Sequence, residues 1–381
     1  MCLRRLLIAA TLLAMSFTAH HLPAQTNHQT VTLVHENGML VLDSIQIDFI
    51  SGQGKIHHPY IDSLHVYNLD SVSFADDIPE LQELHGSRVP LHFTTAGNKL
   101  ALEPHTPEFY AVFAVYHTLH AIDFYKTHFG DLLNFKQKKK YRELELYLGD
   151  YINCSASEYM LNPRARVSPS IIYHEVGHRA FCQLDDTLAI GNVFSMLHNG
   201  LMEYFTTTIA GHPLIGEGML DGPLLRDASK PVKYPRDKYY YDDFLRDLRQ
   251  TVSDSMDCHE ALNKLYRLNK QRADRCTTRI LMTHQTGMLI THPLWEIRNR
   301  TGAAITDRLV VQAMKNMKEV MSGQQAYLKQ GARRETDQPA WYDFLYALLL
   351  TDQQHYGGTH QQVIRKAFRD AGYHTGWVRS P

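Results

Sequence analysis

Five consecutive residues carry the strongest chemical signal in this sequence: His174-Glu175-Val176-Gly177-His178. Two histidines four positions apart lie on one face of a helix, so both imidazoles can bind the same Zn²⁺ ion. Glu175 stands beside the first histidine, where it can take a proton from a metal-bound water. Zinc lowers the pKa of such a water to about 7, which yields a nucleophile at neutral pH. The segment therefore predicts a zinc site with a general base; the alternative is a surface helix with incidental histidines.

A catalytic zinc site needs a third protein ligand and leaves one position open. Glu203 is the best third ligand, because it lies on the next predicted helix, which can pack antiparallel to the first. His198 competes with it, but five residues earlier it lies on a different face, as a surface residue or a hydrogen-bonding partner of the ligands. Asp185 and Asp186 follow the zinc helix too closely to fold back and are interpreted as a helix-terminating pair.

Three other polar residues share one side of a predicted helix: His117, His120 and Asp123. They are candidates for a separate metal cluster. A polar stripe on an amphipathic helix explains them at least as well, and we prefer this interpretation.

The elements that position these residues form a β-rich first part and a helical second part. Strand patterns cover 30–36, 39–43, 64–72, 89–95 and 144–153, and Asn37-Gly38 predicts a two-residue hairpin between the first two. Apolar residues at helical spacing begin after Pro107 and continue to Gly130. Strands followed by helices predict an α+β fold.

Capping signals define the helices of the second part. Ser168 is a predicted N-cap with Pro169 at the first position of the zinc helix. Asn192 is a candidate cap for a helix at 193–209, which the segment starting at Gly211 ends. Thr359 and Gln362 have the spacing of a capping box for a last helix that ends at Gly372.

The bulk composition excludes some classes of partner. The 381 residues include 44% hydrophobic and 21% charged residues, with a net charge of −1. This charge gives no reason to expect nucleic acid or an anionic membrane as a partner.

Arg4 and Arg5, an apolar run at 6–15 and the small Ala24 form a signal-peptide pattern over 1–25. The apolar run is shorter than the roughly 20 residues that span a bilayer. We expect a secreted or periplasmic protein without a membrane span after signal removal; the alternative is a membrane anchor.

Four cysteines remain after signal removal: Cys154, Cys182, Cys258 and Cys276. Four cysteines allow three pairings, among which the sequence does not choose. Disulfides and buried free thiols are both open in an oxidising compartment, and no CxxC pair indicates a thiolate zinc site.

A family resemblance carries further expectations. The zinc segment followed by Glu203 in Gly200-Leu201-Met202-Glu203-Tyr204 resembles the gluzincin metallopeptidases of the thermolysin-like and fungalysin-like type. Looser matches lie at 283–287, 293–298, 305–310 and in the last helices, so the resemblance covers roughly 109–373. The long metzincin motif does not fit, because Phe181 and Leu184 occupy its glycine and histidine positions.

The resemblance implies a peptidase of the zincin fold, with a β-containing N-terminal half, a central zinc helix and a helical C-terminal part. The expected organisation of the chain is a signal peptide at 1–25 and a β-rich N-terminal segment at 26–106. The peptidase domain follows, with its N-terminal part at 107–190, which includes the zinc helix, and its helical C-terminal part at 191–381. It implies one zinc ion held by His174, His178 and Glu203, with Glu175 as general base and His284 steadying the oxyanion. The expected substrate is a peptide or protein. Calcium would also fit the family, but no convincing calcium loop is present.

Some positions depart from the family pattern. Thr207 stands where the family has an aspartate that orients a zinc histidine, and loss of such a partner costs roughly 10–100-fold in metal affinity or activity. Ser155-Ala156 is a poor match for the substrate-pairing Asn-Ala of the edge strand. No tyrosine lies between Cys182 and Glu203, and the segment 239–241 comes later. The alternative function is therefore a zinc-containing binding protein with the same fold and little or no turnover.

Overall fold

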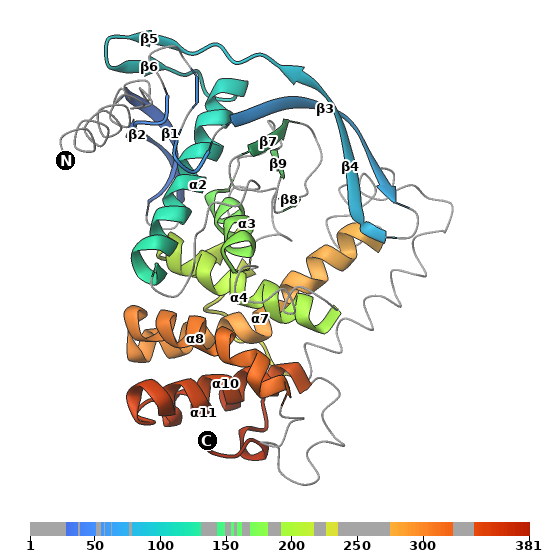
Figure 1. The fold of residues 1–381 in the computed structure, drawn as a ribbon, viewed down its shortest axis with the longest axis vertical. Helices are drawn as coiled ribbons and strands as arrows, with labels where there is room; N and C mark the ends of the chain where they lie inside the picture. Colours follow the sequence, from blue (N-terminus) through green and yellow to red (C-terminus); the bar gives the residue numbers. More distant parts are fainter. Residues whose placement is uncertain are drawn as a thin grey trace, which may run out of the picture.

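A computed structural model gives the structure of most of the chain. It describes residues 28–36, 39–50, 55–56, 58–61, 63–75, 78–130, 143–148, 154–155, 158–161, 168–181, 192–216, 226–234, 275–322 and 339–381. Two sheets lie at one end of the molecule and a stack of helices at the other, where the chain also ends (Figure 1). The architecture is mixed α+β, as the sequence predicts.

The first sheet has four strands in the order β2-β1-β6-β5. Its strands are β1 (His28–Glu36), β2 (Met39–Ile47), β5 (Thr94–Ala96) and β6 (Lys99–Ala101). The first two pair antiparallel with Glu36 opposite Met39, which confirms the predicted pairing around Asn37-Gly38. On β2, Ile45 and Ile47 are buried while the residues between and before them are exposed, so this strand turns alternate side chains into the core.

The second sheet has five strands in the order β4-β3-β7-β9-β8. They are β3 (Ser63–Ala75), β4 (Ile78–Val89), β7 (Glu143–Leu148), β8 (Cys154–Ser155) and β9 (Glu158–Leu161). The three inner strands run parallel, and both outer strands pair antiparallel. Leu144 and Leu146 of the central strand are fully buried. The long β3–β4 hairpin extends beyond the rest of the sheet (Figure 1).

The helices pack in sequence from the sheets outward. They are α2 (Pro107–Phe129), α3 (Pro169–Phe181), α4 (Asn192–Ala210), α7 (Arg275–Thr301), α8 (Ala303–Ser322), α10 (Pro339–Tyr356) and α11 (Gln361–Asp370). Thr106 caps α2 by accepting from the main-chain N–H of Phe109 at 3.2 Å, with Pro107 at the first position. Each of α2, α3, α4 and α7 packs against the next, which places α3 and α4 in the middle of the molecule.

Most predicted elements are confirmed, with three corrections. The strand predicted at 89–95 is wrong: β4 ends at Val89, and β5 begins only at Thr94. β4 itself was missed, because Pro79 and Gly86 interrupt its strand pattern. The predicted capping box is also wrong, because α11 begins after His360 and Thr359 instead donates to the carbonyl oxygen of Tyr356. Gly372, with a φ of +94°, does follow the end of that helix.

Several predictions lie outside the described residues. These are the signal peptide at 1–25, the segment 239–241 and the helix end at Asp185 and Asp186. The structure does not describe the side chains of the four cysteines either. Among the described helices, none is long and apolar enough to cross a membrane.

Glycine permits close contact where the central helices cross. A Cβ atom on Gly177 would lie 2.8 Å from both the sulfur of Met202 on α4 and the hydroxyl of Tyr125 on α2, so a larger residue would require these side chains to move. A Cβ atom on Gly200 would overlap the carbonyl oxygen of Gly287, which marks the contact between α4 and α7. The hydroxyl of Thr291 donates to the carbonyl oxygen of Gly200 at 2.8 Å beside this crossing.

Substitution of Gly200 by alanine is expected to destabilise the protein by roughly 1–2 kcal/mol. Alanine gains about 1 kcal/mol of helix propensity, but overpacking costs roughly 1–3 kcal/mol. The cost of overpacking exceeds the gain in helix propensity here, because the new methyl group would meet the main-chain carbonyl of Gly287, which cannot rotate away as a side chain can. Urea unfolding measures the change. Gly376→Ala is the control, because its Cβ atom would meet nothing within 4 Å. Unchanged or increased stability of Gly200→Ala would contradict the close crossing.

Candidate metal centre

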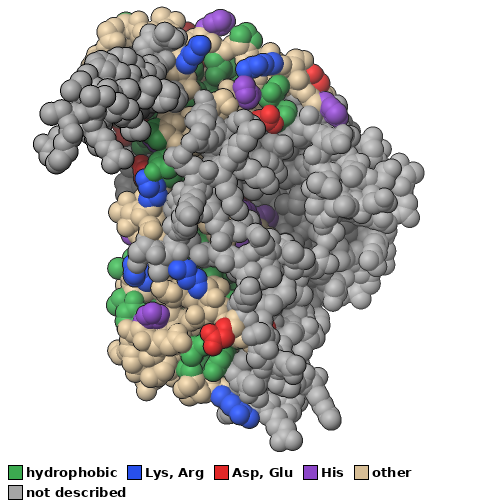
Figure 2. Space-filling view, viewed as in Figure 1, with side chains coloured by type: hydrophobic (Ala, Val, Ile, Leu, Met, Phe, Trp, Pro, Cys, Tyr) green, Lys and Arg blue, Asp and Glu red, His purple; other side chains and the backbone are tan. Residues whose placement is uncertain are grey.

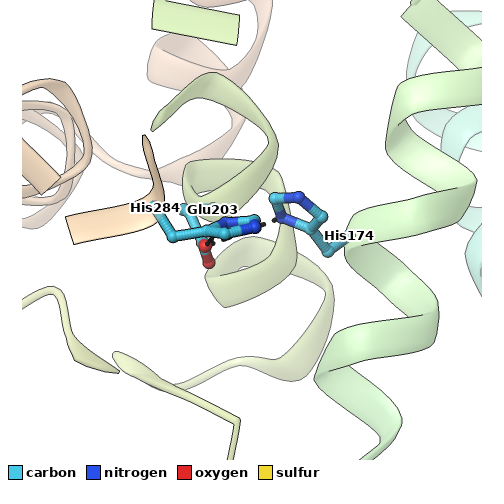
Figure 3. A group of neighbouring side chains, drawn as sticks. All are labelled: His174, Glu203 and His284. Atoms are coloured by element: carbon cyan, nitrogen blue, oxygen red, sulfur yellow. Dashed lines mark hydrogen bonds and ion pairs between the residues drawn. The ribbon is translucent and has the colours of Figure 1, made fainter. Parts of the chain in front are cut away.

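Three helices bring His174, Glu203 and His284 together in the interior. His174 comes from α3, Glu203 from α4 and His284 from α7, and their side chains point toward one another (Figure 3). Their ligand atoms lie within 4.8 Å of one another, so this group could hold a metal ion. Exposed fractions of the side chains are 3% for His174, 0% for Glu203 and 17% for His284.

The helix crossing at Gly200 explains why these residues meet. α4 and α7 run antiparallel, since Gly200 contacts Gly287 while Glu203 contacts His284. Three residues forward on one helix therefore correspond to three residues back on the other, about one turn from the crossing. The contact between Glu203 on α4 and His284 on α7 thus follows from the antiparallel crossing of the two helices.

One oxygen of Glu203 already has two donors. Its Oε1 accepts from a guanidinium nitrogen of Arg226 at 2.8 Å and from Nδ1 of His284 at 2.8 Å. Its Oε2 is buried and has no hydrogen-bond partner among the described residues. Burial raises the pKa of Glu203, but Arg226, His174 and His284 lower it more strongly, to about 2. The carboxylate is therefore ionised, with one oxygen still available to a ligand.

A short ribbon positions Arg226, which the sequence analysis did not identify. Strands β10 (Leu214–Ile215) and β11 (Arg226–Asp227) pair antiparallel, with Ile215 opposite Arg226. The N–H of Gly216 donates to the hydroxyl of Ser170 at 2.8 Å, which ties the ribbon to the start of α3. Arg226 is 5% exposed and so reaches Glu203 through the interior. Its local sequence carries no motif that would mark this role.

The other edge of the His174 ring faces different partners. Its Nε2 lies 2.9 Å from Nε2 of His178 and 3.2 Å from Oδ1 of Asn199. Burial lowers the pKa of His174 to about 3, and it lowers the pKa of His178 well below the usual value. Both imidazoles are therefore neutral at pH 7, which is the form that binds metal. The predicted pair of zinc-helix histidines thus converges, with an amide oxygen beside it.

His198 lies next to this pair and not on the surface. It is 6% exposed, and its ring stacks on His178 with centroids 4.7 Å apart. Neither ring nitrogen has a hydrogen-bond partner within the described part of the chain, and burial lowers the pKa to about 4. The interpretation of His198 as a surface residue is wrong, and its place beside His178 is closer to that of a residue supporting the ligands.

The metal-free protein is expected to lose stability between pH 6.5 and pH 4 because of His198. An unfolded histidine titrates near 6.5, whereas the pKa of native His198 is about 4. The unfolded chain therefore binds the extra proton first, and a contribution of about 3 kcal/mol, complete above pH 6.5, is lost toward pH 4. Urea unfolding at pH 7.0 and 4.5 measures it. We expect His198→Phe, which cannot titrate, to lose about 2 kcal/mol less than the wild type; an equal loss would refute the assignment. His355→Gln, at an exposed position, is the control.

Two further predicted positions are placed as follows. Glu175 lies on α3 between the histidines and is 7% exposed. Thr207 is fully buried, and its hydroxyl donates to the carbonyl oxygen of Tyr204 at 2.7 Å, within α4. Thr207 thus uses its donor on its own helix. Tyr204 in turn donates to Asp307, which also pairs with Arg298 at 2.7 Å and so anchors α4 against α7 and α8.

The polar group on α2 forms no metal cluster among the described residues. His120 and Asp123 are exposed, as the stripe interpretation predicts. His117 departs from it, because it is 2% exposed and its Nδ1 lies 2.8 Å from the hydroxyl of Tyr173. This hydrogen bond joins α2 to the residue before His174.

On the face of the molecule in Figure 2, basic and acidic side chains of the described residues are interspersed and not separated by sign.

A comparison of the chain with protein-family models, with curated proteins and with solved structures finds no match. The candidate function therefore depends on the residues of this site alone.

Proposed function

We propose that the protein is a zinc-dependent peptidase whose centre is built around α3. The observation that carries this proposal is the convergence of His174 and His178, with Nε2 atoms 2.9 Å apart, in a buried site that also contains Glu203 and His284. Two neutral imidazoles and a carboxylate are the donor types that catalytic zinc takes. Nδ1 of His174 and Oε2 of Glu203 are buried without a hydrogen-bond partner among the described residues, so the site without an ion leaves polar atoms unsatisfied.

Each residue of the site would then have a separate role in hydrolysis of the peptide bond. A bound zinc ion would supply Lewis-acid chemistry and a water of lowered pKa. Glu175 would take the proton of that water and deliver it to the leaving amine. His284 holds its Nδ1 proton toward Glu203, which leaves its Nε2 to face a reacting group. Arg226 adds a permanent positive charge, which favours the negative charge that develops on the carbonyl oxygen.

A second candidate function is a zinc-containing binding protein without turnover. The position of Thr207 favours it, because its hydroxyl is used within α4 and supplies no carboxylate to a histidine. The two functions share the metal and differ in whether peptide bonds are broken.

The experiment that tests the proposal uses the purified full-length protein. Metal content is measured first, and a mixed peptide library is then incubated with the zinc-loaded protein, the chelated protein and the chelated protein with zinc restored. We expect cleavage that disappears on chelation and returns with zinc. Zinc binding without any cleavage would support the binding protein instead.

We also propose that the protein is exported and that residues 1–25 are removed. The pattern of Arg4, Arg5, the apolar run and Ala24 supports this. N-terminal sequencing of protein recovered from the periplasm or the medium tests it, and a chain that retains Met1 would contradict it.

A further inference from the structure

The imidazole of His174 has a different set of partners at each nitrogen. Its Nε2 edge faces His178 and Asn199. Its Nδ1 edge faces Glu203, with Oε1 at 3.8 Å, and beyond it His284 and Arg226. One imidazole binds a metal ion through one nitrogen, so the two edges are alternative places for it.

The distances favour the Nε2 edge. Two nitrogens bound to one tetrahedral zinc at roughly 2.0–2.1 Å lie about 3.3 Å apart. The Nε2 atoms of His174 and His178 are 2.9 Å apart, and Oδ1 of Asn199 is 3.2 Å from the first of them. Asn199 also hydrogen-bonds to His178, where it partly opposes the effect of burial on the pKa. Three donor atoms on two helices thus converge.

The charges around the His174 ring also favour the Nε2 edge as the position of the metal ion. At the Nδ1 edge, Oε1 of Glu203 is already neutralised by the guanidinium of Arg226. This pairing leaves little net negative charge at the Nδ1 edge to attract a divalent ion. A carboxylate behind the outer nitrogen of a ligand histidine instead orients the ring and raises its basicity. Glu203 lies on that side of the ring, with Oε1 3.8 Å from Nδ1, so a small movement on metal binding would bring it within hydrogen-bond distance.

The spacing along α4 makes both contacts possible at once. Asn199 and Glu203 are four residues apart, so they lie one turn apart on the same face of the helix. Each side chain therefore reaches a different edge of the same ring. Thr207 lies a further turn along, beyond both contacts, and bonds its own helix.

We propose that Asn199, through Oδ1, is the third metal ligand beside Nε2 of His174 and of His178, and that Glu203 orients His174 from its Nδ1 edge. This inference rests on the proposed function only in requiring a metal ion at α3. It replaces a charged ligand by a neutral one, so the bound ion keeps more of its positive charge and is held less tightly than by a carboxylate. Asn199 is 9% exposed and therefore lies within the buried site.

The test compares zinc affinity in three variants by competition with a chromophoric chelator. Asn199→Asp keeps the shape and adds a negative charge, so we expect tighter binding than in the wild type. Asn199→Leu removes the donor atom and should weaken binding by more than roughly 100-fold. Glu203→Gln should cost only about 10–100-fold, as loss of an orienting partner does. Thr207→Val is the control and should leave the affinity unchanged.

A second readout separates ligand loss from damage to the fold. The visible spectrum of the Co²⁺-loaded protein should change in Asn199→Asp and Asn199→Leu and stay close to wild type in Glu203→Gln. Thermal unfolding of the metal-free variants shows which of them fold, and Asn199→Asp decides the matter if Asn199→Leu does not fold. A larger loss in Glu203→Gln than in Asn199→Leu, or no gain in Asn199→Asp, would overturn the assignment.

The outcomes also separate this assignment from the proposed function. A wild-type protein that binds neither zinc nor cobalt would overturn both. A wild-type protein that binds metal and cleaves nothing would overturn the peptidase, while the order of the three variants would still confirm or refute Asn199 as the ligand.

Discussion

Glu175→Gln is expected to lower the rate of peptide cleavage by about 10²–10⁴-fold, the range of a lost general base. Glutamine has nearly the same shape as glutamate but cannot accept the proton of the attacking water. Because Glu175 stands next to a ligand without being one, we expect the variant to bind zinc with wild-type stoichiometry. Single-turnover assays on the best cleaved peptide, with metal analysis of the same samples, measure both quantities.

The matched control is Glu296→Gln. Glu296 lies on α7, where it pairs with Arg300 at 3.3 Å near the surface. An exposed pair of this kind contributes little to stability, so cleavage and zinc content should both stay at the wild-type level. If Glu175→Gln kept more than about a tenth of the wild-type rate, another residue would have to serve as the base.

Arg226→Met is expected to destabilise the metal-free protein by about 3–5 kcal/mol, the cost of leaving one member of a buried ion pair alone. Both side chains are buried, with exposed fractions of 4% for Arg226 and 0% for Glu203. Without the arginine, the carboxylate must either stay charged in the interior or take up a proton. Its pKa should therefore rise from about 2. Urea unfolding at neutral pH measures the loss.

A double variant shows whether the loss belongs to this pair. Glu203→Gln removes the charge that Arg226 leaves behind, so Arg226→Met combined with Glu203→Gln should recover part of the stability. Lys230→Met is the control, because Lys230 is 79% exposed and pairs with Asp227 at 3.7 Å, and it should change stability by less than about 1 kcal/mol. Additive losses in the double variant would contradict direct coupling.

The sequence predicts α3 and α4 well because their signals are local. Pro169 follows a small polar residue at the start of α3, and α4 begins at Asn192 and ends before Gly211. The approach of α3 to α4, and hence of Glu203 to the histidines, follows from consecutive packing of amphipathic helices. His284 is different, since only the family resemblance singled it out. Its contact with Glu203 depends on the Gly200 crossing, which no local pattern reveals.

Arg226 and Asn199 were missed for separate physical reasons. Arg226 lies on a two-residue strand, too short for any periodic pattern to detect. Asn199 carries a neutral amide, which ordinary helices contain and which is not among the usual protein ligands of zinc, the thiolate, imidazole and carboxylate groups. His198 was misjudged because helix position relative to Glu203 does not show which faces α3 and α7 cover. In each case the missing information is tertiary packing.

The joining of α3, α4 and α7 at one point also links metal concentration to folding. The proposed ligands His174 and Asn199 are 25 positions apart in the chain and lie on different helices, and the unfolded chain does not hold such groups together. An ion that binds only the folded form stabilises it by mass action, by about 2.7 kcal/mol at a free concentration 100 times its dissociation constant. The midpoint of thermal unfolding should therefore rise with the logarithm of free zinc. Available metal would then set how much of the protein remains in its folded form.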